Sequence, residues 1–224
     1  MKRVTVKRVK CVPSEKRKTL SNKSYNLLIG CCILYGLLMN YIIVLNFSDF
    51  FSSINPYLFL ICALSVCFLG IYFVKSSDKP AMCFLGYTLI VIPIGADLSV
   101  ILPKFAQEDI LLAIGLTFCI VSVMTILATL YPQFFSGLGK VLFLSHATCL
   151  LGELIALFAG FRASVYNWIF VIIYTLYVGY YWYRAQSSPK TLDAAIDSAA
   201  GLYLDIINLF LRLLTIIAKS KRRR

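Results

Sequence analysis

Seven apolar runs occupy most of this 224-residue chain, and each is long enough to cross about 30 Å of hydrocarbon at about 1.5 Å of helix rise per residue. The runs cover residues 25–47, 56–74, 81–102, 110–131, 138–160, 165–184 and 197–218. Hydrophobic residues make up 60% of the chain and charged residues only 14%, whereas about a quarter of a soluble domain is charged. Inside a bilayer the backbone polar groups need internal partners, which a helix supplies. The sequence therefore predicts an all-α integral membrane protein, built as a bundle of seven transmembrane helices.

Polar sequence is confined to the two ends and to short connections between the runs. We predict a basic cytoplasmic tail over residues 1–24, a seven-helix membrane domain over 25–218 and a second basic tail over 219–224. The first run is longer than the apolar core of a signal peptide and no small-residue cleavage site follows it, so we expect it to be retained as a helix. No connection is long enough to form an extramembrane domain.

The distribution of Lys and Arg predicts the orientation. Nine of them precede Tyr25 in a chain of net charge +12. The same side of the predicted topology also carries Lys75, Lys79, Lys140, Arg184 and Lys190, against Lys104 and Arg162 on the other side. The amino terminus is therefore expected to be cytoplasmic, with its basic residues against anionic lipid headgroups rather than nucleic acid. Seven crossings would place the basic carboxy-terminal tail outside, so the last run either spans against this rule or re-enters and leaves both termini cytoplasmic.

Ionisable side chains inside a membrane are costly and mark functional sites. Five lie at bilayer depth, away from the ends of the runs: Asp97, His146, Glu153, Asp205 and Arg212. Asp205, Asn208 and Arg212 recur at i, i+3 and i+7, which places them on one helical stripe that faces protein or water rather than lipid. This polar stripe in the last run is the strongest candidate site.

The rise per residue places these groups at different depths. Asp97, Glu153 and Arg212 lie about 22 to 24 Å from their cytoplasmic helix ends, whereas Asp205 lies about 12 Å in. Arg212 could therefore pair with Glu153 or with Asp97, and such pairs are ordinary within a bundle. Asp205 has no basic partner at its level, and burial disfavours a lone charge. It is a candidate proton sensor or cation ligand.

No motif points to catalysis. The chain contains neither the HExxH pattern of zinc proteases nor the GxSxG pattern of serine hydrolases, and Gly95-Ala96-Asp97 only weakly echoes an intramembrane aspartyl protease. His146 and Glu153 share a helix face, but two ligands make a weak metal site, and a hydrogen-bonded structural histidine is the better interpretation. We expect no enzyme and no bound cofactor.

The segment DSAAGLYLDIINLFLRLL, over residues 197–214, resembles the carboxy-terminal signature of the Bax inhibitor-1 family, also called TMBIM. Its core is LYLDIINLF, and further similarity is spread over KPAMCFLGYTLIVIPIG, TLYPQFF and GYYWYRAQSSPKTLDAAIDSAA. The resemblance covers most residues from 24 to 219, and the short loops resemble the bacterial branch of YccA-like and YetJ-like proteins.

This resemblance implies a seven-helix bundle with a central last helix and a pH-sensitive calcium leak. Two aspartates share protons in that family, and Asp205 matches the second of them. Counted back without a gap, the first falls at position 181, where this chain has Tyr181. The carboxyl pair is incomplete, so the leak is expected to depend only weakly on pH. Lys75 is the loose counterpart of a family arginine near the inner end of the second helix.

Two functions from different classes follow. The first is a cation leak in a bacterial cytoplasmic membrane, with calcium as the transported ion and Asp205, beside Tyr181, as its ligand or gate. The alternative is a non-conducting protein that binds another membrane protein, for instance as a modulator of a quality-control protease or of stress survival. The oligomeric state is left open by the sequence, with a monomer favoured.

Overall fold

The computed structural model describes residues 19–158 and 165–221, and this part of the chain is helical. Its long helices are α1 (Asn22–Ser52), α2 (Pro56–Ser76), α3 (Pro80–Ile101), α4 (Gln107–Leu130), α6 (Leu138–Phe158), α7 (Val165–Ser187) and α8 (Leu192–Lys221). Two short elements connect them: the 3-10 turn η1 (Leu102–Lys104) and the five-residue helix α5 (Pro132–Ser136). Each predicted apolar run thus coincides with one long helix.

Local sequence explains where these helices begin. The side chain of Ser21 accepts a hydrogen bond from the backbone N–H of Ser24 at 3.1 Å, ahead of α1. Asn55 accepts from the N–H of Tyr57 at 3.0 Å, ahead of α2. Both caps satisfy donors that the first helical turn leaves free. Pro56 stands at the start of α2, where its missing N–H costs nothing.

The helices extend beyond the apolar runs, and the extension is largest at two places. α1 continues five residues beyond the predicted end at 47, and α8 begins at Leu192 rather than at 197. The stretch PQFFSG, expected as a loop, contains α5. An apolar run measures the thickness of hydrocarbon, whereas a helix continues into the polar interface wherever its residues are good helix formers, as Ala194 and Ala195 are.

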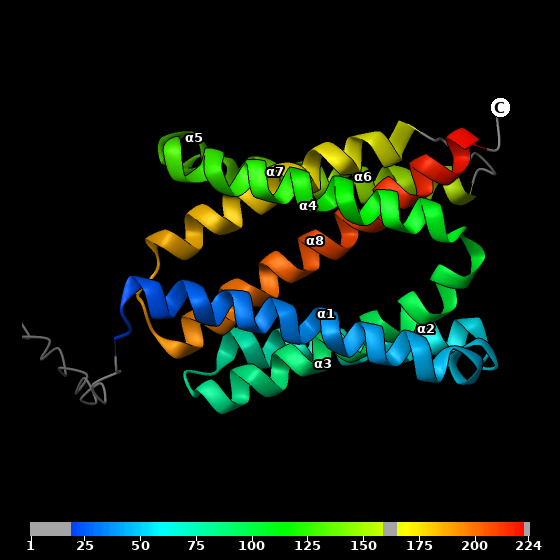
Figure 1. The fold of residues 1–224 in the computed structure, drawn as a ribbon, viewed down its shortest axis with the longest axis horizontal. Coiled ribbons are helices and arrows are strands. Elements are labelled where there is room, and N and C mark those ends of the chain that lie inside the picture. The colour runs from blue at the N-terminus through cyan, green and yellow to red at the C-terminus, as the bar shows by residue number, and fades with distance from the viewer. Residues whose placement is uncertain (1–18, 159–164, 222–224) are drawn as a thin grey trace, which may run out of the picture.

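The helices form two groups with α8 between them (Figure 1). α1, α2 and α3 pack together in one group, and α4, α5, α6 and α7 in the other. α8 crosses diagonally and packs against α1 and α3 on one side and against α4 and α7 on the other. The last helix therefore has the central position expected of it.

Five helices in the described ranges are long and apolar enough to cross a membrane: α1, α2, α4, α8 and α3 together with η1. Large apolar side chains cover the outside, such as Leu27 and Phe118, which are 70% and 71% exposed. α6 carries Lys140, His146 and Glu153 within its apolar sequence, and α7 is rich in tyrosine. The membrane helical bundle is confirmed, while the count of seven crossings stays a prediction.

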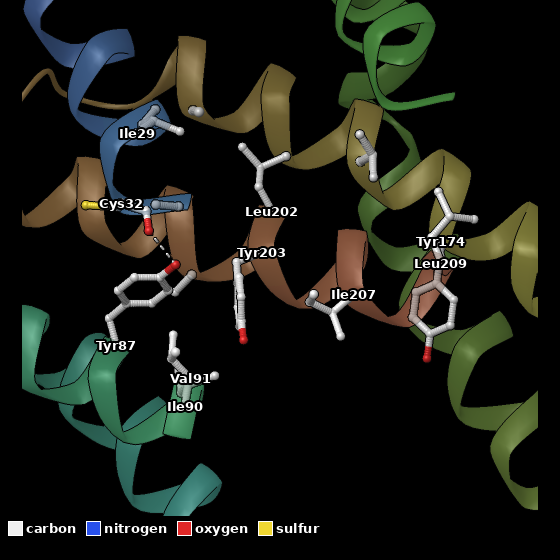
Figure 2. Close-up of a cluster of buried hydrophobic side chains, with 14 of the residues drawn as sticks. Ile29, Cys32, Tyr87, Ile90, Val91, Tyr174, Leu202, Tyr203, Ile207 and Leu209 are labelled. Carbon is white, nitrogen blue, oxygen red and sulfur yellow. Dashed lines mark hydrogen bonds between the residues drawn. The ribbon is translucent and has the colours of Figure 1, made fainter. Parts of the chain in front are cut away.

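A neutral polar cluster fixes α8 to the first group. The Asn40 amide of α1 donates to the Tyr203 hydroxyl of α8 at 2.8 Å, and that hydroxyl donates back to Asn40 Oδ1 at 3.0 Å. Figure 2 shows Tyr203 pointing toward α3, with the Tyr87 hydroxyl bonded to the Cys32 carbonyl. Gly36 of α1 allows the Tyr87 hydroxyl to lie close to the α1 backbone, since a Cβ at position 36 would lie 2.5 Å from the Tyr87 oxygen. Hydrogen bonds between uncharged side chains hold helices together inside a membrane.

Candidate functional site

Asp205 is a buried carboxyl that forms no ion pair with the residues that the structure describes. It lies on α8 with 7% of its surface exposed, and Oδ2 has no hydrogen-bond partner among the residues that the structure describes. Buried polar groups are normally hydrogen-bonded, and an unsatisfied one calls for an explanation. A proton or a cation that binds Asp205 transiently would explain the missing partner.

Three tyrosines of α7, Tyr174, Tyr177 and Tyr181, lie near enough to this carboxyl to interact with it electrostatically. Their spacing of three and four residues places the three hydroxyl-bearing rings on one face of α7, and we call them the tyrosine stripe. The Tyr181 ring packs on Gly201, one turn before Asp205, where a Cβ would lie 2.4 Å from it.

The structure thus brings the Tyr181 ring beside Gly201, one turn before Asp205. In the described part of the chain no hydrogen bond joins the two side chains. The predicted contact within hydrogen-bonding or one-water reach stays a prediction.

Lys75 lies in the last turn of α2 and pairs with Asp197 rather than with Asp205. Its ammonium is 2.8 Å from Oδ1 of Asp197 on α8, and the Arg184 guanidinium of α7 lies 3.3 Å from Oδ2 of the same carboxylate. Asp197 is eight residues before Asp205, about 12 Å along the helix axis. Because Lys75 stands in the last turn of α2, at the end of the bundle, its amine pairs with the carboxylate at that level. This cluster joins α2, α7 and α8.

Arg212 pairs with Glu153, one of the two partners that the depth estimate allowed. Two guanidinium nitrogens of Arg212 donate to the Glu153 carboxylate at 2.7 and 2.9 Å, and one also donates to Asn167 Oδ1 at 3.0 Å. The guanidinium carbon lies 4.2 Å from the centre of the Phe170 ring. This Arg212 cluster joins α6, α7 and α8 through bidentate, charge-assisted hydrogen bonds.

The other predicted site residues are not brought to Asp205. Asp97 belongs to α3, in the opposite helix group, and interacts electrostatically with the thiol of Cys67 on α2. Asn208 donates to the Leu204 carbonyl of its own helix at 2.8 Å. Of the three residues in the predicted stripe, Asp205 and Arg212 face α7. The Asn208 side chain instead bonds to the backbone of its own helix.

Sequence reasoning missed the surroundings of His146. The imidazole contacts Phe170, Tyr174 and Tyr177, with ring centres 5.7, 5.3 and 5.9 Å away. Its Nδ1 is buried and lacks a hydrogen-bond partner among the described atoms, contrary to the expected hydrogen-bonded histidine. Within residues 19–158 and 165–221 no group of three metal-binding side chains occurs. The sequence did contain a signal for an aromatic face on α7: aromatic residues recur there every three or four positions, at Phe170, Tyr174, Tyr177 and Tyr181.

The ends of the bundle carry further ionic contacts. Lys221, the last described residue of α8, lies 2.7 Å from Asp109 and 3.2 Å from Glu108, both at the start of α4. At the opposite end, Lys190 donates to the Ala185 and Gln186 carbonyls that end α7, and burial there lowers the pKa of its ammonium. α8 is one unbroken helix, and its two ends lie at opposite ends of the bundle.

Comparison with known proteins shows one matching family. The sequence pattern of the family described as inhibitor of apoptosis-promoting Bax1 matches residues 17–222. Two proteins of Helicobacter pylori, both described as "uncharacterized protein", are similar as well. The relative from strain J99 is 29% identical over 160 residues, 68% of this chain and 67% of the relative. The relative from strain 26695 is 30% identical over 158 residues, 67% of this chain and 66% of the relative, slightly less than two thirds of its length.

Proposed function

Because this chain belongs to the Bax inhibitor-1 family, we propose that it forms a weak cation leak, with calcium as the transported ion. The chain is an integral multi-pass membrane protein of this family. In the proposal the ion passes along the interface of α7 and α8, beside Asp205. The activity is transport and involves no covalent chemistry.

The unsatisfied carboxyl of Asp205 beside the tyrosine stripe is the observation that carries the proposal. Calcium takes six to eight oxygen ligands. Beside Asp205 a calcium ion would meet one carboxylate, a few hydroxyl oxygens and water. These are fewer strong ligands than a protein that stores calcium provides, so the ion would bind weakly and leave readily, as conduction requires. Tyr181 stands where the resemblance implies the first aspartate of the pair, so Asp205 has no second carboxyl beside it at that position.

Ion pairs flank this position along α8. The Lys75–Asp197–Arg184 cluster lies about 12 Å toward the start of the helix, and the Arg212 cluster about 10 Å toward its end. Each ties α8 to neighbouring helices through ion pairs. We assign to them the role of closing the path at its two ends.

The proposed setting is a bacterial cytoplasmic membrane, with seven crossings and a cytoplasmic amino terminus. The excess of Lys and Arg on the amino-terminal side supports this orientation. The pairing of Lys221 with Glu108 and Asp109 supports a crossing by α8, since it offsets basic charge on the translocated side.

Calcium flux into liposomes tests the proposal. The purified protein is reconstituted with an entrapped calcium dye, as wild type, Asp205→Asn and Asp97→Asn. Asp205→Asn removes the charge in the path and is expected to lower the flux about tenfold, whereas Asp97→Asn, in the other helix group, leaves it near the wild-type value. Equal flux in wild type and Asp205→Asn contradicts the proposed path.

One observation favours the second candidate, a non-conducting protein that binds another membrane protein. Gly115 and Cys119 lie exposed one turn apart on α4, with open space around Gly115. Small residues at this spacing permit close helix association in membranes. Wild-type protein that reconstitutes as folded but passes no calcium, together with crosslinking of a partner through Cys119, would favour this function.

A further inference from the structure

A groove opens on the outside of the first helix group, at the end of the bundle where α1 ends. Its volume is about 300 Å³, and apolar side chains from the last turn of α1, the first half of α2 and the second half of α3 line it. The proposed cation path, at the interface of α7 and α8, does not involve this groove. The groove is therefore a separate feature of the surface.

Small side chains between large ones create the groove. Ala63 of α2 and Ala96 of α3 leave space between their helices, and Ala96 lies at the bottom with 2% of its surface exposed. Phe51 of α1 and Phe59 of α2 line the same groove, with ring centres 5.9 Å apart. The hollow thus lies between aromatic rings on one side and two alanines on the other.

The groove is continuous with the lipid-facing surface. Leu58 and Ile92, which line it, are 57% and 40% exposed. Its volume equals about ten water molecules in the liquid, enough for part of one acyl chain. A helix with its side chains is about 10 to 12 Å across and is too wide to enter. Because lipid tails are as apolar as leucine, apolar contact alone gives no preference for one lipid. A preferred lipid needs a second contact, at its headgroup.

Lys104 stands where a headgroup would lie. The Ser48 hydroxyl of α1 donates to the Ser99 carbonyl of α3 at 2.8 Å, so these two residues are at one level. The turn from α1 to α2 begins five residues after Ser48, and Lys104 follows Ser99 by five residues. The end of α1, the start of α2 and the end of α3 lie at the same end of the bundle (Figure 1). The exposed Lys104 forms no ion pair with the residues that the structure describes.

We propose that this groove binds one acyl chain of a phospholipid, with the Lys104 ammonium against the lipid phosphate. The lipid belongs to the leaflet at this end of the bundle, which is the non-cytoplasmic one in the predicted orientation. Basic residues are disfavoured on that side of a membrane, and a phosphate beside Lys104 compensates its charge. The binding is non-covalent and does not rest on the proposed cation path.

Photocrosslinking tests the acyl-chain contact. The full chain is placed in phosphatidylcholine nanodiscs that contain some phosphatidylglycerol with a diazirine in its acyl chain, and labelled positions are found by mass spectrometry. Label should be enriched in the groove-lining parts of α2 and α3 over the exposed face of α4 around Phe118. Ala63→Trp fills the groove and should remove this enrichment. Leu64→Trp, at the next position of α2 and outside the groove, should keep it. Even labelling of both surfaces, or enrichment that survives Ala63→Trp, overturns the proposal.

Variants of Lys104 test the headgroup contact without altering the groove. Lys104→Gln should lower the groove label about fivefold, the effect of one basic residue near anionic lipid. Lys104→Arg keeps the charge and should keep the label, as should Lys79→Gln at the opposite end of α3. Equal label in wild type and Lys104→Gln overturns the proposal. Cys62, which lines the groove, reports the other possible occupant. Crosslinking of Cys62 between two copies, with no lipid label in the groove, would assign the groove to a second copy and overturn the lipid site.

Discussion

The Arg212 cluster should be a measurable stabilising contact between α6, α7 and α8. Arg212→Met keeps a long side chain but removes all three hydrogen bonds of the guanidinium to Glu153 and Asn167. Glu153→Gln keeps the shape and removes the charge. Together with the double variant, these form a thermodynamic cycle that isolates the interaction of Arg212 with Glu153.

The exposure of the two side chains places the expected coupling energy between two limits. Exposed ion pairs contribute about 0.2 to 1 kcal/mol, and breaking a fully buried pair costs about 3 to 5 kcal/mol. The side chains of Arg212 and Glu153 are 22% and 39% exposed, so the pair lies between these limits. Two interhelical hydrogen bonds at about 0.6 kcal/mol each, strengthened by charge, give a coupling energy of about 1 to 2 kcal/mol.

Unfolding in mixed micelles, titrated with a denaturing detergent, measures this coupling. Arg212→Met alone should cost more than the coupling, because it leaves the Glu153 charge and Asn167 without their partner. Glu108→Gln is the matched control, since Glu108 is 87% exposed and its pairing with Lys221 is open to water, so no measurable change is expected. A coupling energy below about 0.3 kcal/mol would refute the reasoning.

Three further predictions concern the tyrosine stripe and the topology. Gly201→Ala places a methyl group 2.4 Å from the Tyr181 ring and should lower the free energy of unfolding by about 1 to 3 kcal/mol, whereas an unchanged value would show that the ring does not pack there. Tyr181→Asp restores two neighbouring carboxyls that share a proton, so calcium leak in liposomes should depend more steeply on pH between about 6 and 8 than in wild type. Identical profiles would exclude the carboxyl-pair account. A reporter fused before Tyr25 should be active on the cytoplasmic side alone, while a cysteine added after Arg224 should react from the outside; labelling of that cysteine only from the cytoplasm would indicate re-entry of the last helix.

Hydropathy and helix geometry were sufficient to predict the main features of the fold. The apolar runs locate the long helices because crossing hydrocarbon requires both length and internal hydrogen bonding. The same rise per residue placed Glu153 at the depth of Arg212, and the two form an ion pair. Depth alone could not decide between Glu153 and Asp97. That choice depends on how α8 is rotated toward α7, which is a property of packing.

The sequence was less informative where side chains have two roles. Lys75 and Arg184 were counted as topology charges, and nothing in their spacing showed that both would bind Asp197. Tyr174 and Tyr177 stand in an apolar run that was interpreted as a membrane crossing alone, so their hydroxyl groups were overlooked, whereas Tyr181 was named beside Asp205. Asn40, in the middle of the first run, was an available signal for a buried polar partner, found at Tyr203. Helix boundaries in the interface were missed because polar residues there can continue a helix.

Chemical modification at position 205 tests most directly whether Asp205 lines a cation path. Asp205→Cys is reconstituted in liposomes and treated with a negatively charged or a positively charged methanethiosulfonate reagent, with wild type treated in parallel to correct for its native cysteines. The flux of Asp205→Cys should be low, rise after the negative reagent restores an acidic group, and stay low after the positive one. Flux in Asp205→Cys that equals wild type and responds to neither reagent would contradict a cation path beside this residue.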